Sequence, residues 1–404
     1  MSNERKQSKL GELIRELCPD GVEYKKVGNV ADYEQPSKYL VKSTDYNDDF
    51  ETPVLTAGQT FVLGYTNEID GIYPASKESP VIIFDDFTAA FKWVDFPFKA
   101  KSSAMKMITA KGNVLIRYLY HLMGFLNYSS DEHKRLWLSL YSEFKIPVPP
   151  LPVQREIVRI LDKFTELTAE LTAELTARKK QYEFYRDKLL TFDNAKVPQL
   201  ELRSVVKKSC SGSTPTKGNS EYYTNGTIPW IRTQDVRFNE ITEVDSYITE
   251  KAVAETAAKW IPENCVIVAI SGATAGRCAI NKIKATTNQH CLNLEIDETK
   301  ALYKYIYYCV YNKYDELISR KQGARGDLNS SLVLSLKIPV PSLEVQKRLV
   351  YVLDNFDAIC SDLKIGLPAE IEARKKQYEF YRDALLTYAA TGIIIQTDRQ
   401  TEHN

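Results

Sequence analysis

Two blocks of sequence occur twice in this chain, and the duplication limits the possible folds more than any other feature. The block KIPVPPLPVQREIVRILDKF at Lys145–Phe164 matches KIPVPSLEVQKRLVYVLDNF at Lys337–Phe356. The block ARKKQYEFYRD at Ala177–Asp187 recurs letter for letter at Ala373–Asp383, and a tandem TAEL lies between the blocks of the first copy, at Thr168–Leu175. Repeated blocks of this kind predict two copies of one structural unit.

Each copy has the apolar spacing of a long helix. In the first copy, apolar residues recur at steps of three and four over Val153–Leu189, which predicts one continuous helix. The second copy has the same stripe over Val345–Leu385, where Gly366 and Pro368 predict a kink or a break. Two such stripes would bury themselves against each other as a coiled-coil-like pair, although a simple dimerisation zipper or spacer stays open.

The segments outside these helices have a different character. Short β-forming runs such as SPVIIF, KWVDFPF, CVIVAI and HCLNLEI alternate with Gly, Asn, Asp and Pro, which predicts mixed α/β domains. The predicted fold class is therefore α+β, with two α/β domains joined by two long helices. The predicted domains are a first domain with an N-terminal helix (1–142), a central repeat helix (143–194), a second domain (195–334), a distal repeat helix (335–390) and a C-terminal tail (391–404).

The composition limits which cellular compartment and which kinds of catalytic site are expected. Seven cysteines without a CxxC pair, and a first segment without an apolar signal core, predict a reducing cytoplasm. No run approaches the roughly 18 apolar residues that cross a bilayer. The chain also lacks the GxxxxGK[ST], GxGxxG and HExxH patterns and has only four histidines. We therefore expect no catalytic, cofactor or metal site in this chain.

Basic residues cluster locally, although Lys+Arg and Asp+Glu are both 53. Residues 90–117 carry six basic side chains and one acidic one, interleaved with Trp93, Phe96 and Phe98. Residues 203–237 carry six basic side chains and two acidic ones. Such patches suit contacts to phosphates and bases. A solvated lysine face without a ligand remains the alternative for each patch.

The chain resembles the specificity subunit of type I restriction-modification enzymes. The second domain carries SGSTPTK (Ser211–Lys217), YYTNGTIPWIRTQDV (Tyr222–Val236), VIVAISGATAGRCAI (Val266–Ile280) and TTNQH (Thr286–His290) in this order. The first domain is similar through YEQPSKYLVK, VLTAGQTFVLGYTNE, VIIFDDFT and FKAKSSAMKM, and the tandem TAEL resembles the subgroup usually called type IC.

The resemblance implies two target recognition domains on an antiparallel helical scaffold with pseudo-twofold symmetry. It implies that the chain reads a bipartite, asymmetric target in double-stranded DNA together with two methyltransferase subunits and two restriction/translocase subunits. S-adenosylmethionine, ATP and Mg²⁺ would belong to those partners, and this chain would not be an enzyme. A coiled-coil adaptor that binds only proteins is the alternative function.

Polar and basic residues in the turn-rich motifs are the candidate DNA contacts. Gln or Asn can pair with adenine, and Arg with guanine. The candidates are Gln59, Lys92, Lys99, Lys101, Ser102, Ser103, Thr214, Lys217, Arg232, Thr233, Gln234, Thr274, Arg277, Asn288, Gln289 and Arg325.

The TAEL tandem predicts a ruler between the two recognition domains. One further TAEL unit after Leu175 adds about 6 Å of helix and nearly preserves the phase of the apolar stripe. Because base pairs lie about 3.4 Å apart, we expect the unspecified spacer of the target to widen by about one to two base pairs. Methylation mapping in cells with this insertion tests the expectation. An unchanged spacer, or changed half-site bases, would contradict it.

Overall fold

The longest element is an unbroken helix of 39 residues, α4 (Leu151–Leu189), which contains the TAEL tandem and the first ARKKQYEFYRD block. In the second copy, α9 (Leu343–Ser361) ends and α10 (Leu367–Thr391) begins on either side of a turn, so the predicted break is confirmed. A Cβ on Gly366 would lie 2.5 Å from the carbonyl oxygen of Ala358, which explains the glycine in this turn. The structure, a computed structural model, describes residues 8–58, 60–130, 134–321 and 327–392.

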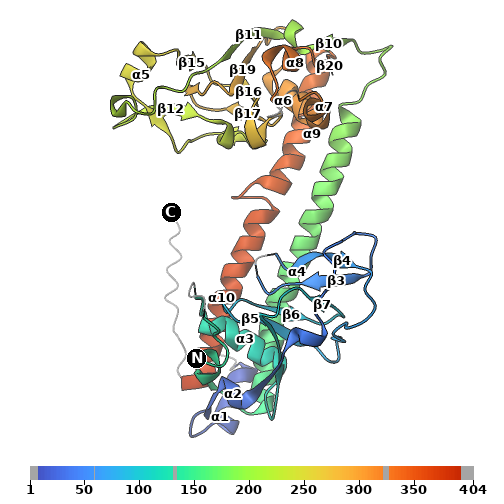
Figure 1. The fold of residues 1–404 in the computed structure, drawn as a ribbon, viewed down its shortest axis with the longest axis vertical. Helices are drawn as coiled ribbons and strands as arrows, with labels where there is room; N and C mark the ends of the chain where they lie inside the picture. The colour runs from blue at the N-terminus through green and yellow to red at the C-terminus, as the bar shows by residue number, and fades with distance from the viewer. Residues whose placement is uncertain (1–7, 59, 131–133, 322–326, 393–404) are drawn as a thin grey trace, which may run out of the picture. The chain divides into compact units, whose positions relative to one another are not determined.

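The chain divides into two units of similar construction. Unit 1 comprises Met1–Thr172 and Glu370–Asn404, and unit 2 comprises Ala173–Ala369. The boundary on α4 falls within the TAEL tandem. Each unit consists of an α/β domain and the helical segments packed against it, which confirms the predicted fold class of two mixed α/β domains with long helices (Figure 1). The exact domain limits drawn from the sequence stay a prediction.

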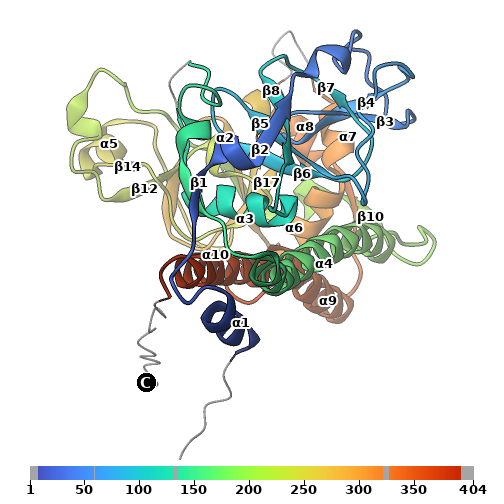
Figure 2. The same ribbon diagram turned by 90° about the horizontal axis from the view of Figure 1, so that it is seen from below.

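Unit 1 contains two sheets and a layer of helices. The sheets have the strand orders β2-β8-β5-β6 and β4-β3-β7, and a further strand β1 pairs with β9 before α4. Figure 2 shows α10 and α4 side by side. Helix α3 lies between this pair of helices and the strands β5 and β6. The bounds are α1 (Lys9–Leu17), β1 (Tyr24–Lys26), α2 (Val27–Val30), β2 (Ala31–Glu34), β3 (Thr52–Leu55), β4 (Val62–Thr66), β5 (Val81–Asp85), β6 (Phe91–Val94), β7 (Lys99–Ala100), β8 (Met105–Ala110), α3 (Ile116–Leu126) and β9 (Lys145–Pro147).

Unit 2 has the same arrangement, and each of its two sheets has one more strand than its counterpart in unit 1. The strand orders are β11-β19-β16-β17-β13 and β14-β12-β18-β15, and β10 pairs with β20 before α9. The bounds are β10 (Gln199–Glu201), β11 (Val206–Ser211), β12 (Ile228–Ile231), β13 (Glu240–Ile241), β14 (Tyr247–Ile248), α5 (Glu250–Glu255), β15 (Trp260–Ile261), β16 (Val266–Ala269), β17 (Cys278–Asn281), β18 (Ala285–Thr287), β19 (Cys291–Ile296), α6 (Tyr303–Asn312), α7 (Tyr314–Ser319), α8 (Ser330–Leu334) and β20 (Lys337–Pro339).

The central strands separate two apolar clusters in each unit. Alternate side chains of a strand point to opposite faces of its sheet. In β5, Ile82 and Phe84 therefore pack in the cluster beneath the helices, while Val81 and Ile83 pack in the cluster between the two sheets. In β16, residues 266 and 268 face the helices, and residues 267 and 269 face the second sheet.

The same aromatic contact joins the two helical segments within each unit. In unit 1, the Phe164 ring of α4 stacks on Tyr381 of α10, with 5.0 Å between centroids. In unit 2, the Phe356 ring of α9 stacks on Tyr185 of α4, with 5.8 Å between centroids. Phe164 corresponds to Phe356 in the repeat, and Tyr185 to Tyr381. Each unit therefore joins one block of the first copy to the other block of the second.

A half-buried aspartate on the repeat helix of each unit (α4 in unit 1 and α9 in unit 2, here called the scaffold helices) binds the helix of the α/β domain, α3 or α6. Asp162 of α4 accepts hydrogen bonds from Arg117, at 2.7 Å, and from His121, at 3.0 Å. Burial alone would raise the pKa of Asp162, but these bonds lower it below the ordinary aspartate value. At the equivalent place in unit 2, Asp354 of α9 accepts bonds from Lys304, at 2.9 Å, and Tyr308, at 2.6 Å. Different donors thus serve the same helix-to-helix contact.

A buried glutamine fixes the start of each scaffold helix. The Gln154 side chain accepts a bond from the Leu115 amide at 2.9 Å and donates to the carbonyls of Asn113, at 2.9 Å, and Pro149, at 2.8 Å. In unit 2, the Gln346 side chain makes the same three kinds of bond, with the backbone of residues 300, 302 and 341. Both glutamines are fully buried. Their burial was not predicted from the sequence, although both stand after valine in the repeated block.

Replacement of either buried glutamine should destabilise its unit. Gln154→Leu or Gln346→Leu would leave buried backbone groups unpaired, at a cost of about 3 kcal/mol in the free energy of unfolding. Gln181→Leu is the control: this α4 side chain is half-buried and accepts only a bond of 3.1 Å from the exposed Arg178, so its loss should cost less than about 0.5 kcal/mol. Thermal unfolding of the three variants measures this. Equal stability of Gln154→Leu and Gln181→Leu would show that the buried bonds do not hold the helix.

Candidate nucleic-acid interface

Loops gather at one end of the larger sheet in unit 1. Strand β2 ends at Glu34, β5 ends at Asp85, and β8 begins at Met105, so the residues beyond them lie at the same end of the sheet. Two backbone bonds tie these loops together: the Asp86 amide donates to Ala104 at 3.0 Å, and the Leu136 amide donates to Asp86 at 2.8 Å. This set of loops is called the loop end of unit 1.

Unit 2 has an equivalent loop end. Strand β11 ends at residue 211, β16 ends at residue 269, and β19 begins at residue 291. The two tying bonds recur: the Ile270 amide donates to His290 at 2.9 Å, and the Leu328 amide donates to Ile270 at 2.8 Å. Residues 86 and 270 therefore occupy corresponding positions, as do residues 104 and 290.

The loop end of unit 2 brings together most of the contacts predicted there. The Asn288 amide donates to the Ile231 carbonyl at 3.0 Å, which adds the end of β12 to the group. The turn between β16 and β17 lies beside it, because the segments 233–235 and 272–274 are in contact. The predicted residues that meet here are Thr214, Arg232, Thr233, Gln234, Thr274, Arg277, Asn288 and Gln289, while Lys217 stands exposed farther along the first loop.

These side chains differ in what they offer to a ligand. The Thr214 hydroxyl donates to the exposed Gln289 side chain, so the two groups order each other. Arg232 lies with its guanidinium carbon 5.9 Å from the Trp230 ring centroid and is half-buried. Asn288 is buried, and its side chain accepts a bond from the His290 amide at 3.1 Å. Asn288 therefore shapes the turn, while Gln289 and Arg232 reach the surface.

Gly212 lets the first loop pass very close to β18. A Cβ at Gly212 would lie 1.8 Å from the Thr287 carbonyl oxygen, which is far inside van der Waals contact. The Ser213 amide donates to the same oxygen at 2.9 Å, and the Trp230 indole donates to the Ser213 carbonyl at 3.1 Å. The glycine therefore allows the SGSTP segment to lie against β12 and β18, the strands that end directly before Arg232 and Asn288.

In unit 1, three predicted residues lie near the loop end. Ser102 and Ser103 are exposed in the loop before β8, and the Ser102 hydroxyl accepts a bond from the Ala104 amide at 3.1 Å. The Lys101 ammonium donates to the Tyr46 hydroxyl at 3.1 Å and is half-buried. These residues correspond to the Asn288–Gln289 loop of unit 2.

Two other lysines that were predicted to contact DNA, Lys92 and Lys99, lie away from the loop end of unit 1. Lys99 is 1% exposed; its ammonium is 2.9 Å from the Glu68 carboxylate and donates to the Asp70 carbonyl at 2.6 Å. The hydrogen bond from Lys99 lowers the pKa of Glu68 to about 2. Lys99 therefore stabilises the interior of the domain in this structure. Lys92 is half-buried in the edge strand β6, opposite Ile83.

Whether any of these residues contacts DNA stays a prediction. Gln59 and Arg325 lie outside the described residues.

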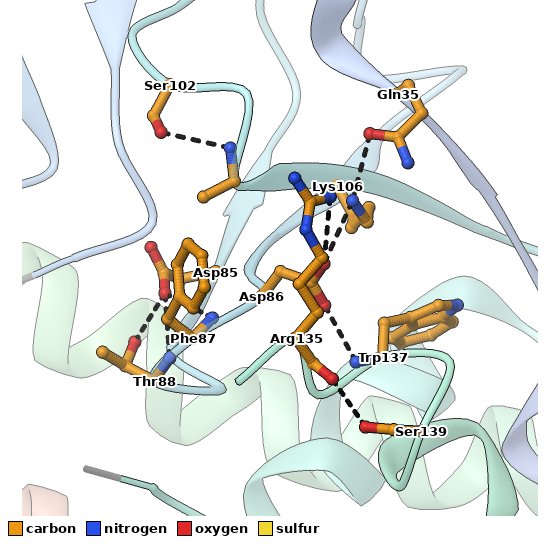
Figure 3. Close-up of polar contacts among 11 residues, drawn as sticks. Gln35, Asp85, Asp86, Phe87, Thr88, Ser102, Lys106, Arg135, Trp137 and Ser139 are labelled. Atoms are coloured by element: carbon orange, nitrogen blue, oxygen red, sulfur yellow. Dashed lines mark hydrogen bonds and ion pairs between the residues drawn. The ribbon is translucent and has the colours of Figure 1, made fainter. Parts of the chain in front are cut away.

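A buried ion pair lies at the loop end of unit 1, and it was not predicted from the sequence. The Lys106 ammonium lies 3.1 Å from the Asp86 carboxylate and donates to the Gln35 side-chain oxygen at 3.0 Å (Figure 3). The second Asp86 oxygen accepts a bond from the Trp137 amide at 2.8 Å, and Arg135 lies 3.8 Å from the first. Lys106 and Asp86 are far apart in the sequence, so no local pattern predicts their pairing.

Neither a membrane helix nor a metal-binding group is found among the described residues. No described helix is long and apolar enough to span a bilayer. No group of three or more His, Cys, Asp and Glu side chains in the described ranges is arranged to hold a metal ion.

The sequence matches one protein family along most of its length. The family described as "Type I restriction modification DNA specificity domain" matches twice, at residues 19–178 and 196–373. The specificity subunit of the type I restriction enzyme EcoR124I/EcoR124II of Escherichia coli is 46% identical over 384 residues. The aligned region covers 91% of this chain and 94% of that protein.

Solved structures share the fold at low sequence identity. The S subunit of a type I restriction-modification system from M. genitalium has a TM-score of 0.53 and 13% identity, and the match covers 91% of this chain and 96% of that one. A chain from a study of assembly and conformational transition in a type I restriction-modification system has a TM-score of 0.58 and 16% identity. That match covers 91% of this chain and 98% of the other, and both comparisons concern the fold alone.

Substitution of Gly212 should disrupt the loop end of unit 2. In Gly212→Ala the added methyl group would collide with backbone, which cannot move as a flexible side chain can, so the loop must leave β18. We expect a lower thermal unfolding midpoint and faster amide hydrogen exchange in residues 211–217 and 287–290. Gly218→Ala is the matched control, since its added Cβ would meet no atom within 4 Å. Equal exchange rates in the two variants would disprove the close packing.

Proposed function

The chain belongs to the type I restriction-modification DNA specificity family, and we propose that each of its two α/β domains reads one half of a bipartite, asymmetric DNA target. A specificity subunit recognises the DNA sequence, and partner subunits carry the catalytic activity. The chain is therefore not itself an enzyme, and it acts with methyltransferase and restriction subunits. Family membership does not favour the alternative of a protein-binding adaptor without DNA binding.

The single observation that carries the proposal is the pair of equivalent loop ends. The same two backbone bonds tie the loops at residues 86 and 270, so the frame is the same in both units. The side chains on that frame differ, with Ser102 and Ser103 in unit 1 where unit 2 has Asn288 and Gln289. Equal frames with unlike polar side chains suit two readers that recognise different bases.

We assign DNA contacts to the predicted residues whose side chains reach the surface of the loop ends. Arg232, Arg277 and Gln289 have the donors and acceptors that read base edges in the major groove. Hydroxyl and lysine side chains suit the sugar-phosphate backbone. The assigned residues are Lys101, Ser102, Ser103, Thr214, Arg232, Thr233, Gln234, Thr274, Arg277 and Gln289, while Asn288 and Lys99 would support the frame.

Partner subunits would dock on the repeated scaffold. The identical ARKKQYEFYRD blocks expose the same aromatic ring in each copy, with Phe184 61% and Phe380 45% exposed. Two equal surfaces suit two copies of one partner. We therefore propose two methyltransferase subunits, joined by two restriction/translocase subunits in the full complex. S-adenosylmethionine, ATP and Mg²⁺ would be bound by these partners.

Two finer assignments rest on the sequence. The TAEL tandem supports placement in the type IC subgroup. Action on cellular DNA and the lack of a CxxC pair support a cytoplasmic location.

Exchange of the second domain tests the proposed function. Residues 195–334 are replaced by the corresponding segment of a relative, and methylated sites are mapped in cells that also carry the methyltransferase subunit. We expect one half of the target to change and the other half to stay the same, because each domain has its own loop end. The reciprocal exchange of residues 1–142 should change the other half. A change in both halves after a single exchange would contradict independent reading.

A further inference from the structure

The buried ion pair of unit 1 stands where unit 2 has only apolar side chains. Both Lys106 and Asp86 are 2% exposed at their side chains. Lys106 is opposite Phe84 in the strand pairing, and Leu292 is opposite the corresponding residue of β16, Val268. Residue 86 is likewise equivalent to Ile270, because both make the two tying bonds. Leu292 and Ile270 pack in the apolar cluster of unit 2.

The fold itself therefore does not require this ion pair. Burial of two charges costs desolvation free energy, and apolar residues of similar size often stabilise a protein equally well or better. Unit 2 builds the same frame with leucine and isoleucine. A role beyond stability is the better explanation for the charges in unit 1.

The ion pair anchors two exposed side chains at the loop end (Figure 3). Gln35 follows β2, is exposed, and has its side-chain oxygen bound to the Lys106 ammonium at 3.0 Å. The Arg135 side chain is 59% exposed, and its guanidinium lies 3.8 Å from the Asp86 carboxylate. The charges are thus inside, and the groups that they hold are at the surface.

This anchoring decides what Gln35 offers to a ligand. Because its oxygen faces Lys106, its NH₂ group is left to donate outward, and the lysine charge strengthens that donor. Acceptors on base edges in the major groove are purine N7, guanine O6 and thymine O4. Arg135 is held more loosely and suits a phosphate near that base.

We propose that Gln35 reads a base in the half-site of the first domain, that Arg135 contacts a neighbouring phosphate, and that the buried Asp86–Lys106 pair positions both. The inference rests on the proposed function, and it adds residues that the motifs did not indicate. Asp86 and Lys106 are positioning residues in this arrangement, since neither side chain reaches the surface.

The first test uses the complex of the full chain with its methyltransferase subunit, bound to duplexes that carry the mapped target or single-base changes. In Gln35→Ala, discrimination at one base pair of the first half-site should fall about 5- to 150-fold. Discrimination across the second half-site should stay as in the wild type. Arg135→Ala should weaken binding to all duplexes and lower the slope of log affinity against log salt by about one. Lys111→Ala, at the opposite end of β8, is the control and should change neither quantity.

The second test removes the charges but keeps the packing. The double variant Asp86→Ile with Lys106→Leu has the apolar pair of unit 2 and should still fold, with a thermal unfolding midpoint lowered by the loss of the bond from the Trp137 amide. It should nevertheless lose discrimination at the same base pair as Gln35→Ala. The control double variant Asp32→Ile with Lys111→Leu removes the exposed ion pair of 2.8 Å at the far end of the sheet and should discriminate like the wild type.

Three outcomes would overturn the inference. Wild-type discrimination in Gln35→Ala, or loss confined to the second half-site, would exclude base reading by Gln35. Wild-type discrimination in a folded Asp86→Ile, Lys106→Leu chain would exclude the positioning role. If that double variant does not fold, Gln35→Ala and Gln35→Glu still decide, because Gln35 is exposed. A wild-type complex that discriminates in neither half would instead refute the proposed function.

Discussion

The buried side-chain amide at the start of each scaffold helix is the contact on which the rest of the structure depends. Gln154 and Gln346 each join three backbone segments: the turn before the helix, the strand-to-helix connection of the domain, and the helix itself. An unpaired buried polar group costs free energy, so each glutamine fixes the position of the domain on its helix. The aspartate contacts at residues 162 and 354 continue this attachment about two helical turns farther along.

This attachment divides each domain into a constant side and a variable side. The sheet presents one face to the helices, with pairs such as Ile82 and Phe84 or their counterparts in β16, and its loop end lies beyond the strands. Backbone bonds hold the loop end in the same shape in both units, while the side chains there are free to differ. A duplicated scaffold can therefore carry two unlike recognition surfaces, which is what a reader of an asymmetric DNA target needs.

The charged residues of unit 1 show how the same frame is adapted. Lys99 pairs with Glu68 inside the domain, and Lys106 pairs with Asp86 at the loop end, so two of the lysines in the basic segment 90–117 do not face solvent. A count of basic residues therefore overstates the charge available to phosphates in this domain. The exposed groups at the loop end include polar side chains such as Ser102 and Gln35, which suit specific hydrogen bonds more than general attraction.

Periodicity and duplication in the sequence determined the long helices, the break near Gly366 and the presence of two similar units, because these features depend on residues within a few turns of one another. The central strands were also predictable, since runs such as SPVIIF and CVIVAI have the composition of buried strands. Only the tertiary structure decided which polar residues lie inside. A single Gln in an amphipathic helix looks like a surface residue, and Asp86 and Lys106 meet only because β5 and β8 are neighbours in the sheet. Burial of a charge or an amide depends on partners that are distant in the sequence, and no local pattern records them.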